Sequence, residues 1–311
     1  MAAKPTKTNT ATQVVAVIFV VFLLIVAGFF ILRAAQTEES DITKPAIAVI
    51  PISGAISLQG DGANAQDIIK EIRKADRDPS IKAIILDINS PGGTVVASEE
   101  IAAAVKGAKK PVVAWIEEIG ASGAYWIASA SDYIVADPAS ITGSIGVTGS
   151  YLQFSDLLNK TGVTYERLVT GKFKDTGSQF KDLTPEERAY LQAKLDAINT
   201  IFINTVATNR NLDPAYVRTL ATGEIWIGQE AKGFGLVDVL GGRGEAQLAA
   251  QQLAGLSSSR LVNIEEQQKG LIDLFSSGSQ SIAYWIGKGI GDSWNPLSNQ
   301  QDDFALMAQA P

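Results

Sequence analysis

Three short glycine-rich stretches each contain a serine, and these serines are the first residues whose spacing suggests chemistry. The stretches are NSPGGT at 89–94, GASGAY at 120–125 and ITGSIGV at 141–147. Glycine lets the backbone turn sharply and approach a ligand closely. Each stretch follows a segment typical of a β-strand. Because loops after parallel strands commonly build the binding site of an α/β protein, we expect the three stretches to form one site.

Ser122 is the candidate nucleophile among these serines. An apolar, helix-compatible run, AYWIASA, follows the Ser122-Gly123 pair, so the hydroxyl is expected at a helix start, where N–H groups favour negative charge. The N–H of Gly123 could stabilise an oxyanion, and the glycines at 92–93 could supply a second donor. A simpler interpretation is that Ser122 only caps the helix. The residues alone leave both interpretations open.

Composition limits how a serine could be activated. The 311 residues include no cysteine and no histidine, which excludes disulfides, thiolate metal sites and a Ser-His-Asp triad. A lysine could serve as the base, but a lysine ammonium, with an ordinary pKa of about 10.4, does so near neutral pH only when burial lowers that value. Lys172 and Lys174 lie two residues apart in TGKFKDTGSQF at 170–180. On an extended segment they would face opposite sides, so at most one faces the site.

Two binding functions fit the sequence poorly. The net charge of −7 argues against a nucleic-acid-binding surface. Glycine-rich loops can also bind phosphate, but the chain has no GxxxxGK[ST] motif and SPGG does not match GxGxxG. We therefore expect no nucleic-acid partner and no nucleotide cofactor.

The segments between these stretches predict an α/β fold with parallel strands, because strand and helix patterns alternate. Expected strands lie at 46–54, 82–89, 111–118, 132–138 and 163–171, with helices at 64–78, 94–109 and directly after Ser122. A long helix is expected at 183–210, with Thr184 and Glu187 forming a capping box. A strand, a helical turn and a glycine-rich exit follow at 223–242, then another helix and a strand near 260–265.

The N-terminal region contains an uncharged apolar run at 14–32. It is long enough to cross a hydrocarbon core of about 30 Å as a helix, so we expect an uncleaved membrane anchor. Lys4 and Lys7 precede the run, and Arg33 with a mainly acidic sequence follows it. This charge bias places residues 1–13 in the cytoplasm and residues 34–311 outside.

Four motifs in order resemble the signal peptide peptidase A family, bacterial membrane peptidases of the Clp-protease/crotonase superfamily that use a Ser/Lys pair. They are NSPGG, ASGAYWIASASDYIVADPASITGSIGV, TGKFKD and GEIWIGQEAKGFGLVDVLGG. The similarity covers about 46–255. It implies a Clp-protease/crotonase-like α/β fold of repeated strand-strand-helix units, following an N-terminal transmembrane helix. The resulting division is a cytoplasmic segment at 1–13, an anchor at 14–32, a linker at 33–45, a peptidase domain at 46–255 and a C-terminal extension at 256–311.

The resemblance also implies roles for individual residues. Ser122 matches the family's nucleophile, and Lys174, just before an aspartate, matches its general base. Ser144 matches the serine that hydrogen-bonds this lysine, whereas Gly93 and Gly123 match the oxyanion donors. Lys172 remains an alternative base. The chain has Ala124-Tyr125-Trp126 where many members have Gly-Tyr-Tyr, a departure expected to affect specificity more than activity.

The expected activity is a serine endopeptidase that degrades cleaved signal peptides and other small apolar peptides at the membrane lipid, without a metal or cofactor. Short members of the family assemble as ring-shaped homo-oligomers in which neighbouring subunits supply the serine and the lysine of one site. Two alternatives stay open: a peptidase dedicated to a stomatin-like membrane partner, and an inactive peptide-binding scaffold. A further hypothesis places the C-terminal FALMAQAP in the substrate groove, because Ala308-Gln309-Ala310 resembles the end of a signal peptide.

Overall fold

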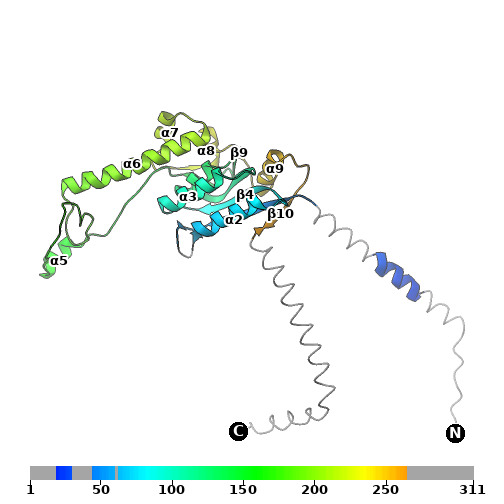
Figure 1. The fold of residues 1–311 in the computed structure, drawn as a ribbon, viewed down its shortest axis with the longest axis horizontal. Helices are drawn as coiled ribbons and strands as arrows, with labels where there is room; N and C mark the ends of the chain where they lie inside the picture. Colours follow the sequence, from blue (N-terminus) through cyan, green and yellow to red (C-terminus); the bar gives the residue numbers. More distant parts are fainter. Residues whose placement is uncertain (1–18, 30–43, 60–61, 265–311) are drawn as a thin grey trace, which may run out of the picture. The chain divides into compact units, whose positions relative to one another are not determined.

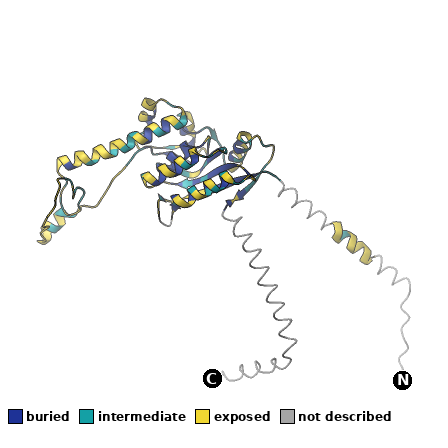
Figure 2. Ribbon diagram, viewed as in Figure 1, coloured by how far each residue is buried: buried dark blue, intermediate teal, exposed yellow. Residues whose placement is uncertain are grey.

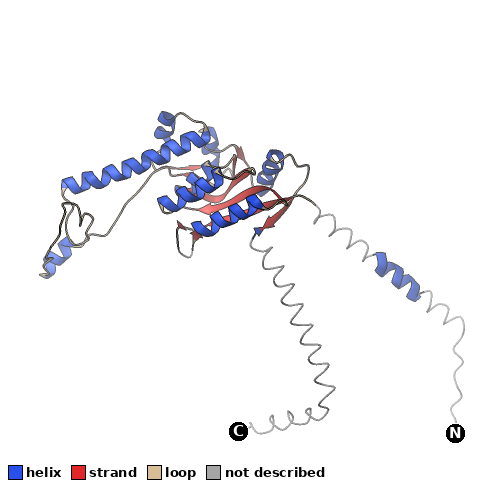
Figure 3. Ribbon diagram, in the orientation of Figure 1, coloured by secondary structure: helices blue, strands red, loops and turns tan. Residues whose placement is uncertain are grey.

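The computed structural model describes residues 19–29, 44–59 and 62–264. Within these residues, eight strands form one sheet in the order β10-β1-β4-β5-β6-β9, and β7 pairs with β5 and β8 (Figure 3). The strands of this sheet are β1 (Ala46–Ser53), β4 (Ile81–Ser90), β5 (Val112–Ala121), β6 (Tyr133–Ala136), β7 (Ile141–Gly143), β8 (Ile225–Ile227), β9 (Val239–Leu240) and β10 (Arg260–Asn263). The short strands β2 (Ile56–Ser57) and β3 (Ala63–Asn64) pair separately.

The predicted parallel pairing is confirmed in the centre of the sheet. β4 runs parallel to β1 and β5, and β5 runs parallel to β6 and β7. Only β8, which pairs with β7, is antiparallel to its neighbour among the strand pairs given for the described residues. The carboxyl ends of β4, β5 and β7 consequently lie at one edge of the sheet, and each is followed by one of the three glycine-rich stretches.

Helices cover both faces of this sheet. Their bounds are α2 (Ala65–Arg77), α3 (Val95–Lys106), α4 (Gly123–Ser129), α5 (Ser155–Thr161), α6 (Pro185–Arg210), α7 (Pro214–Leu220), α8 (Gly228–Gly233) and α9 (Arg243–Leu253). Ile47, Ile85 and Val113 pack with Ala246 and Ala250 of α9 in one buried cluster. Because side chains alternate along a strand, the buried residues between them in sequence face the other side, where α2 packs on β1 and β4. Figure 2 shows the buried sheet in dark blue.

α6 is anchored by one half only. Its buried apolar residues, Phe202, Ile203, Val206 and Ala207, all lie in its C-terminal half, whereas the buried residue of its first turns is Glu187. The capping box of Thr184 and Glu187 is confirmed. The N-terminal half of α6 therefore extends away from the core. Figure 1 shows α5 at that end of the helix.

The prediction of a strand at 163–171 is wrong. Residues 163–169 have no regular structure, and every one of them is exposed. A strand needs a neighbouring strand for its backbone N–H and C=O groups, and no strand among the described residues pairs with this segment. The β-branched pattern that suggested a strand belongs instead to exposed apolar residues, including Leu168 at 90% exposure.

The described part of the expected anchor, residues 19–29, is helical. In the described ranges, the structure contains no helix whose length and apolar character would suffice to cross a membrane. The rest of 14–32 and the C-terminal FALMAQAP sequence lie outside the described residues.

Candidate active site

Ser122 occupies a sharp turn between a strand and a helix. β5 ends at Ala121 and α4 begins at Gly123, so Ser122 joins them with φ of 55° and ψ of −122°. A residue with a side chain rarely adopts a positive φ, and such strain costs about 1–3 kcal/mol. The hydroxyl makes no capping hydrogen bond to α4. The alternative that Ser122 is only a helix cap requires a hydrogen bond from an N–H of α4 to the Ser122 hydroxyl, and this bond is absent. The hydroxyl therefore stays available for chemistry.

The other two glycine-rich stretches hold this turn in place. The Ser122 N–H donates to the carbonyl oxygen of Gly143 at 2.9 Å, which ties the turn to the end of β7. On the other side, Gly92 has a φ of 99°, and a Cβ there would lie 2.7 Å from the Gly123 nitrogen and 2.9 Å from the Ser122 Cβ. Only glycine fits this approach. The three stretches therefore meet around Ser122, as their positions after parallel strands predicted.

Gly93 and Gly123 bring two backbone N–H groups to the same place. Within the described residues, neither N–H has a hydrogen-bond acceptor, although the Ile56 N–H bonds Gly92 and the Thr94 N–H bonds Ile56 on either side of Gly93. A Cβ on Gly123 would lie 3.2 Å from the Gly93 nitrogen, so the two glycines are close neighbours. Two adjacent unpaired N–H groups beside a serine hydroxyl can stabilise an oxyanion.

A small cavity of about 100 Å³ lies at Ser122. Its wall includes the buried Trp126, whose ring stacks on Phe202 of α6 with centroids 4.4 Å apart and planes 13° apart. Trp126 was the position where the sequence departs from its family pattern, and it does line the cavity. The lining is Gly93, Val95, Ser98, Ser122, Gly123, Trp126, Gly146, Val147, Thr148 and Phe202.

The sequence motifs do not include four of these lining residues, Val95, Ser98, Thr148 and Phe202, of which Ser98 and Phe202 are buried side chains. Ser98 is fully buried on α3, and its hydroxyl donates to the Thr94 carbonyl at 3.0 Å. A Cβ on Gly123 would come within 2.2 Å of that hydroxyl oxygen, so Ser98 closes the space behind the nucleophile's turn. No motif marks either residue, because both are placed by helix packing rather than by a loop signature.

Ser144 lies directly after β7, beside the Gly143 carbonyl that binds Ser122. It also has a positive φ, 49°, and its N–H donates to the Glu224 carbonyl at 2.7 Å. Ser144 is half-buried next to the turn that carries the nucleophile. The structure thus places Ser122, Gly93, Gly123 and Ser144 together.

Lys174 is not among them. It is exposed in the turn before α6, where residues on both sides of it contact the first turns of that helix: Phe173 stacks on Tyr190, and Thr176 donates to Glu187. Phe202, further along α6, contacts Trp126 beside the nucleophile. At about 1.5 Å per residue, Tyr190 and Phe202 are about 18 Å apart along the helix axis. The turn with Lys174 is thus held at the first turns of α6, and no contact given for the described residues joins Lys174 to Ser122.

Lys172, the alternative base, forms an ion pair with Glu186 on the surface. The two side chains are 64% and 58% exposed, so this is a solvated pair. The pair with Glu186 holds Lys172 at the same end of α6 as Lys174. No contact given for the described residues joins Lys172 to Ser122.

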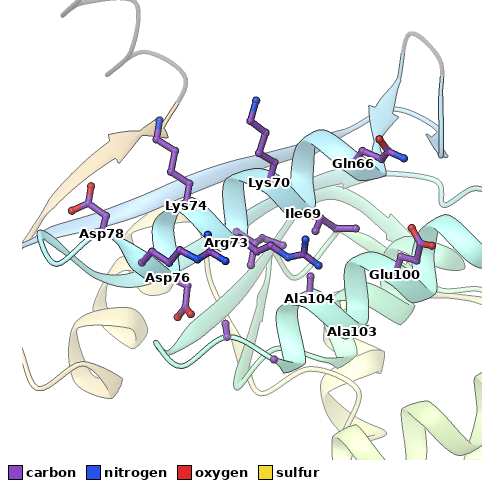
Figure 4. A pocket seen from close by; sticks show the side chains of 14 residues that line it. Gln66, Ile69, Lys70, Arg73, Lys74, Asp76, Asp78, Glu100, Ala103 and Ala104 are labelled. Carbon is purple, nitrogen blue, oxygen red and sulfur yellow. The ribbon is translucent and has the colours of Figure 1, made fainter.

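A larger hollow, of about 1270 Å³, lies between α2 and α3. Figure 4 shows Arg73 and Glu100 on the facing sides of these helices, whereas Lys70 and Lys74 point away from α3. None of the candidate catalytic residues lines this hollow. Size alone therefore does not locate the candidate active site, and the small cavity is the one that Ser122, Gly93 and Gly123 line.

Buried hydrogen bonds support the nucleophile from beneath. Every residue of α4 is buried, and the Tyr125 hydroxyl donates to the Leu236 carbonyl at 2.9 Å. Burial raises the pKa of Tyr125, so its hydroxyl stays protonated and keeps donating. Nearby, Arg210 of α6 pairs with Asp238 at 2.6 Å. The Tyr125 hydrogen bond ties α4, and with it the turn at Ser122, to the segment of Leu236, which the Arg210–Asp238 pair joins to α6.

Comparisons with known proteins agree with this fold. The Peptidase family S49 model matches residues 104–257, and the Clp protease model matches residues 49–157. "Putative protease MJ0651" of Methanocaldococcus jannaschii is 36% identical over 290 residues, which cover 89% of this chain and 92% of that protein. "Putative signal peptide peptidase SppA" of Enterococcus faecium is 31% identical over 278 residues, covering 86% of this chain and 78% of the relative.

Two further matches differ in extent. "Protease 4" of Salmonella typhi is 36% identical over 270 residues, but these cover only 43% of that protein. The solved structure of a mutant of the "1510-N membrane-bound stomatin-specific protease" has a TM-score of 0.47 and 17% identity, and covers 71% of this chain and 98% of that one. This structural likeness is too low to support a conclusion about function.

The molecule is thus a serine peptidase with an α/β fold of the Clp-protease type. The chain belongs to peptidase family S49, and the resemblance to signal peptide peptidase A is confirmed.

Proposed function

We propose that this peptidase uses Ser122 and Lys174 to cleave signal-peptide remnants and other small apolar peptides. The observation that carries the proposal is the strained turn at Ser122, which leaves a free hydroxyl beside the unpaired N–H groups of Gly93 and Gly123. An inactive scaffold would have no need to maintain this strain.

The proposed reaction proceeds in two halves. Uncharged Lys174 takes the proton from the Ser122 hydroxyl, and the oxygen attacks the peptide carbonyl carbon while Gly93 and Gly123 hydrogen-bond the oxyanion. The tetrahedral intermediate collapses, the C–N bond breaks, and Lys174 gives its proton to the leaving amine. Water then attacks the acyl-enzyme, with Lys174 taking a proton from it and returning that proton to Ser122. Neither half needs a metal or a cofactor.

Lys174 reaches the serine from a neighbouring copy in this proposal. The separation of about 18 Å along α6 between the contacts near Lys174 and the contacts near Ser122 supports such an arrangement. Repeated head-to-tail contacts that place one copy's lysine in the next copy's site close into a ring. Ser144 is half-buried beside the turn at Ser122. Its hydroxyl would form a hydrogen bond with the amine of that lysine and so orient it.

The cavity at Ser122 favours apolar peptide residues of modest size. Its volume is about 100 Å³, whereas an apolar cavity of about 150 Å³ accommodates a benzene ring. Aliphatic side chains of the kind found in signal peptides fit, and aromatic rings are disfavoured.

The peptidase domain, residues 46–255, is proposed to lie outside the cytoplasm, where a single-pass anchor at residues 14–32 holds it at the membrane. The apolar run and the charges around it support this orientation. Residues 33–45 would then link the anchor to the domain, and 256–311 would form the C-terminal extension. The arrangement brings the site close to peptides that remain in the lipid.

Peptide hydrolysis by single-site variants tests the proposal. A fluorogenic peptide with an aliphatic residue before the scissile bond would be assayed between about pH 6 and pH 10. We expect Ser122→Ala and Lys174→Ala each to lower kcat by at least about 1,000-fold, because removing either residue of a catalytic pair disables the pair. Lys172→Ala should remain active. Full activity in Ser122→Ala would refute the assignment of the nucleophile.

A further inference from the structure

The residues that flank Lys174 in sequence each have a side-chain partner. Lys172 pairs with Glu186, Phe173 stacks on Tyr190, Asp175 pairs with Arg167, and Thr176 donates to Glu187. Lys174 is the exception: among the described residues its side chain has no hydrogen bond and no ion pair. A turn that fixes its neighbours and leaves one lysine free is arranged to present that lysine.

The ion pair between Asp175 and Arg167 is the first firm contact. Arg167 binds both carboxylate oxygens, Nη2 at 2.7 Å and Nε on the other side, which is the two-pronged geometry that fixes orientation as well as distance. The Asp175 side chain is only 10% exposed. Arg167 lies in the exposed, irregular segment before the turn, so this pair ties the turn to a second stretch of chain.

The second firm contact is the stack of Phe173 on Tyr190. The ring centroids are 4.7 Å apart and the planes differ by 15°. Tyr190 belongs to α6, a regular element whose other half is packed into the core. The stack therefore ties the turn to a regular helix, in addition to the tie that Asp175 makes to Arg167.

We propose that Phe173 and Asp175 are positioning residues that hold the Lys174 turn in the geometry needed to reach the serine of a neighbouring copy. This inference rests on the proposed function, because it assumes that Lys174 is the general base. Neither residue touches substrate. Each acts through the backbone of the turn, and a displacement of the base by about 1 Å can lower a rate by about 100-fold.

Steady-state kinetics on the full chain test this role. Asp175→Asn and Phe173→Leu should each lower kcat by about 10- to 100-fold while KM stays unchanged, since the substrate cavity lies at Ser122 and is made by other residues. Phe173→Tyr keeps the ring and should restore kcat. Because a smaller folded fraction would also lower the apparent kcat at constant KM, kcat is calculated per folded chain from the circular dichroism of each variant, and a full recovery of kcat on that basis would refute the positioning role.

Glu186→Gln is the matched control. It removes an ion pair from the same turn, but that pair is solvent-exposed and exposed pairs contribute little. Its kcat should stay within about twofold of the wild type. If Glu186→Gln lowers kcat as much as Asp175→Asn and Phe173→Leu do, the proposal is overturned, because any change in the turn would then have the same effect.

Two further outcomes separate this inference from the proposed function. If Lys174→Ala is inactive but Asp175→Asn and Phe173→Leu are fully active, the positioning role is refuted and the function stands. If Lys174→Ala is active, both are refuted. The elution volume of each variant must match that of the wild type. A change in assembly would show that the residues build the interface rather than position the base, which also overturns the inference.

Discussion

Ser122 adopts a backbone conformation that side-chain-bearing residues avoid, and its surroundings keep it there. The Gly143 carbonyl binds its N–H, and Gly92 packs against it so closely that no side chain would fit. The positive φ places the hydroxyl at the head of α4 without engaging it in a cap. The positive φ costs stability at this residue, and under the proposed function it keeps the nucleophile free.

Glycine at position 122 should reveal that strain. Ser122→Gly removes the penalty for positive φ and should be more stable than Ser122→Ala by about 1 kcal/mol, although glycine also gives the unfolded chain more freedom. Both variants should be inactive. Urea unfolding of the two proteins measures the difference, and equal midpoints would show that the turn is unstrained.

The sequence predicted most of the residues around Ser122 for a simple reason. Glycine-rich loops that follow parallel strands meet at one edge, so Gly93, Gly123 and Ser144 could be grouped from chain order alone. Ser98 and Phe202 could not be predicted, because a serine in a helix and an apolar residue in a long helix are common everywhere. Only packing between helices brings them to the cavity.

Among the elements, α6 links two distant regions. Its C-terminal half places Phe202 against Trp126, and its N-terminal half holds the turn with Lys174. The capping signal at Thr184 and Glu187 predicted where the helix begins. The prediction of a strand at 163–171 was wrong because the signal there is not local. The apolar pattern is typical of a strand, but a strand also needs a paired neighbouring strand, which the sequence does not show.

Acid should weaken the start of α6. Lys181 and then Thr184 lower the pKa of Glu187 from its ordinary 4.5 to about 2. Because the folded pKa is depressed, this contribution to stability is complete above about pH 4.5 and is lost as the pH falls towards 2. Urea unfolding followed by circular dichroism should show the loss.

Glu187→Gln provides the comparison for that measurement. Glutamine can still cap the helix but cannot titrate, so this variant should be less stable than the wild type at neutral pH and less sensitive to acid. An unchanged acid response in Glu187→Gln would assign the sensitivity to other carboxylates.

On the scale of the whole molecule, the proposed catalytic residues fall in two regions. Ser122, Gly93 and Gly123 lie together at the small cavity, while the turn with Lys174 contacts the first turns of α6. Chain order could not predict this separation, since the direction of α6 depends on the packing of its second half.

Mixing two inactive variants should restore activity. If neighbouring copies share a site, Ser122→Ala chains supply the lysine and Lys174→Ala chains supply the serine. After joint assembly from equal amounts, about a quarter of the sites would contain both intact residues. Peptide hydrolysis by the mixture, compared with each variant alone, measures this. No recovery in properly assembled mixtures would place both residues of each site in one chain.

The exposed position of Lys174 has a consequence for the life of the protein in the cell. Under the proposed function, a newly made chain carries a nucleophile without its base and cannot hydrolyse any neighbour while it remains alone. Proteolysis then begins only when local concentration in the membrane is high enough for copies to meet. Hydrolysis per chain should fall on dilution, so the abundance of the protein itself would act as a control on its activity.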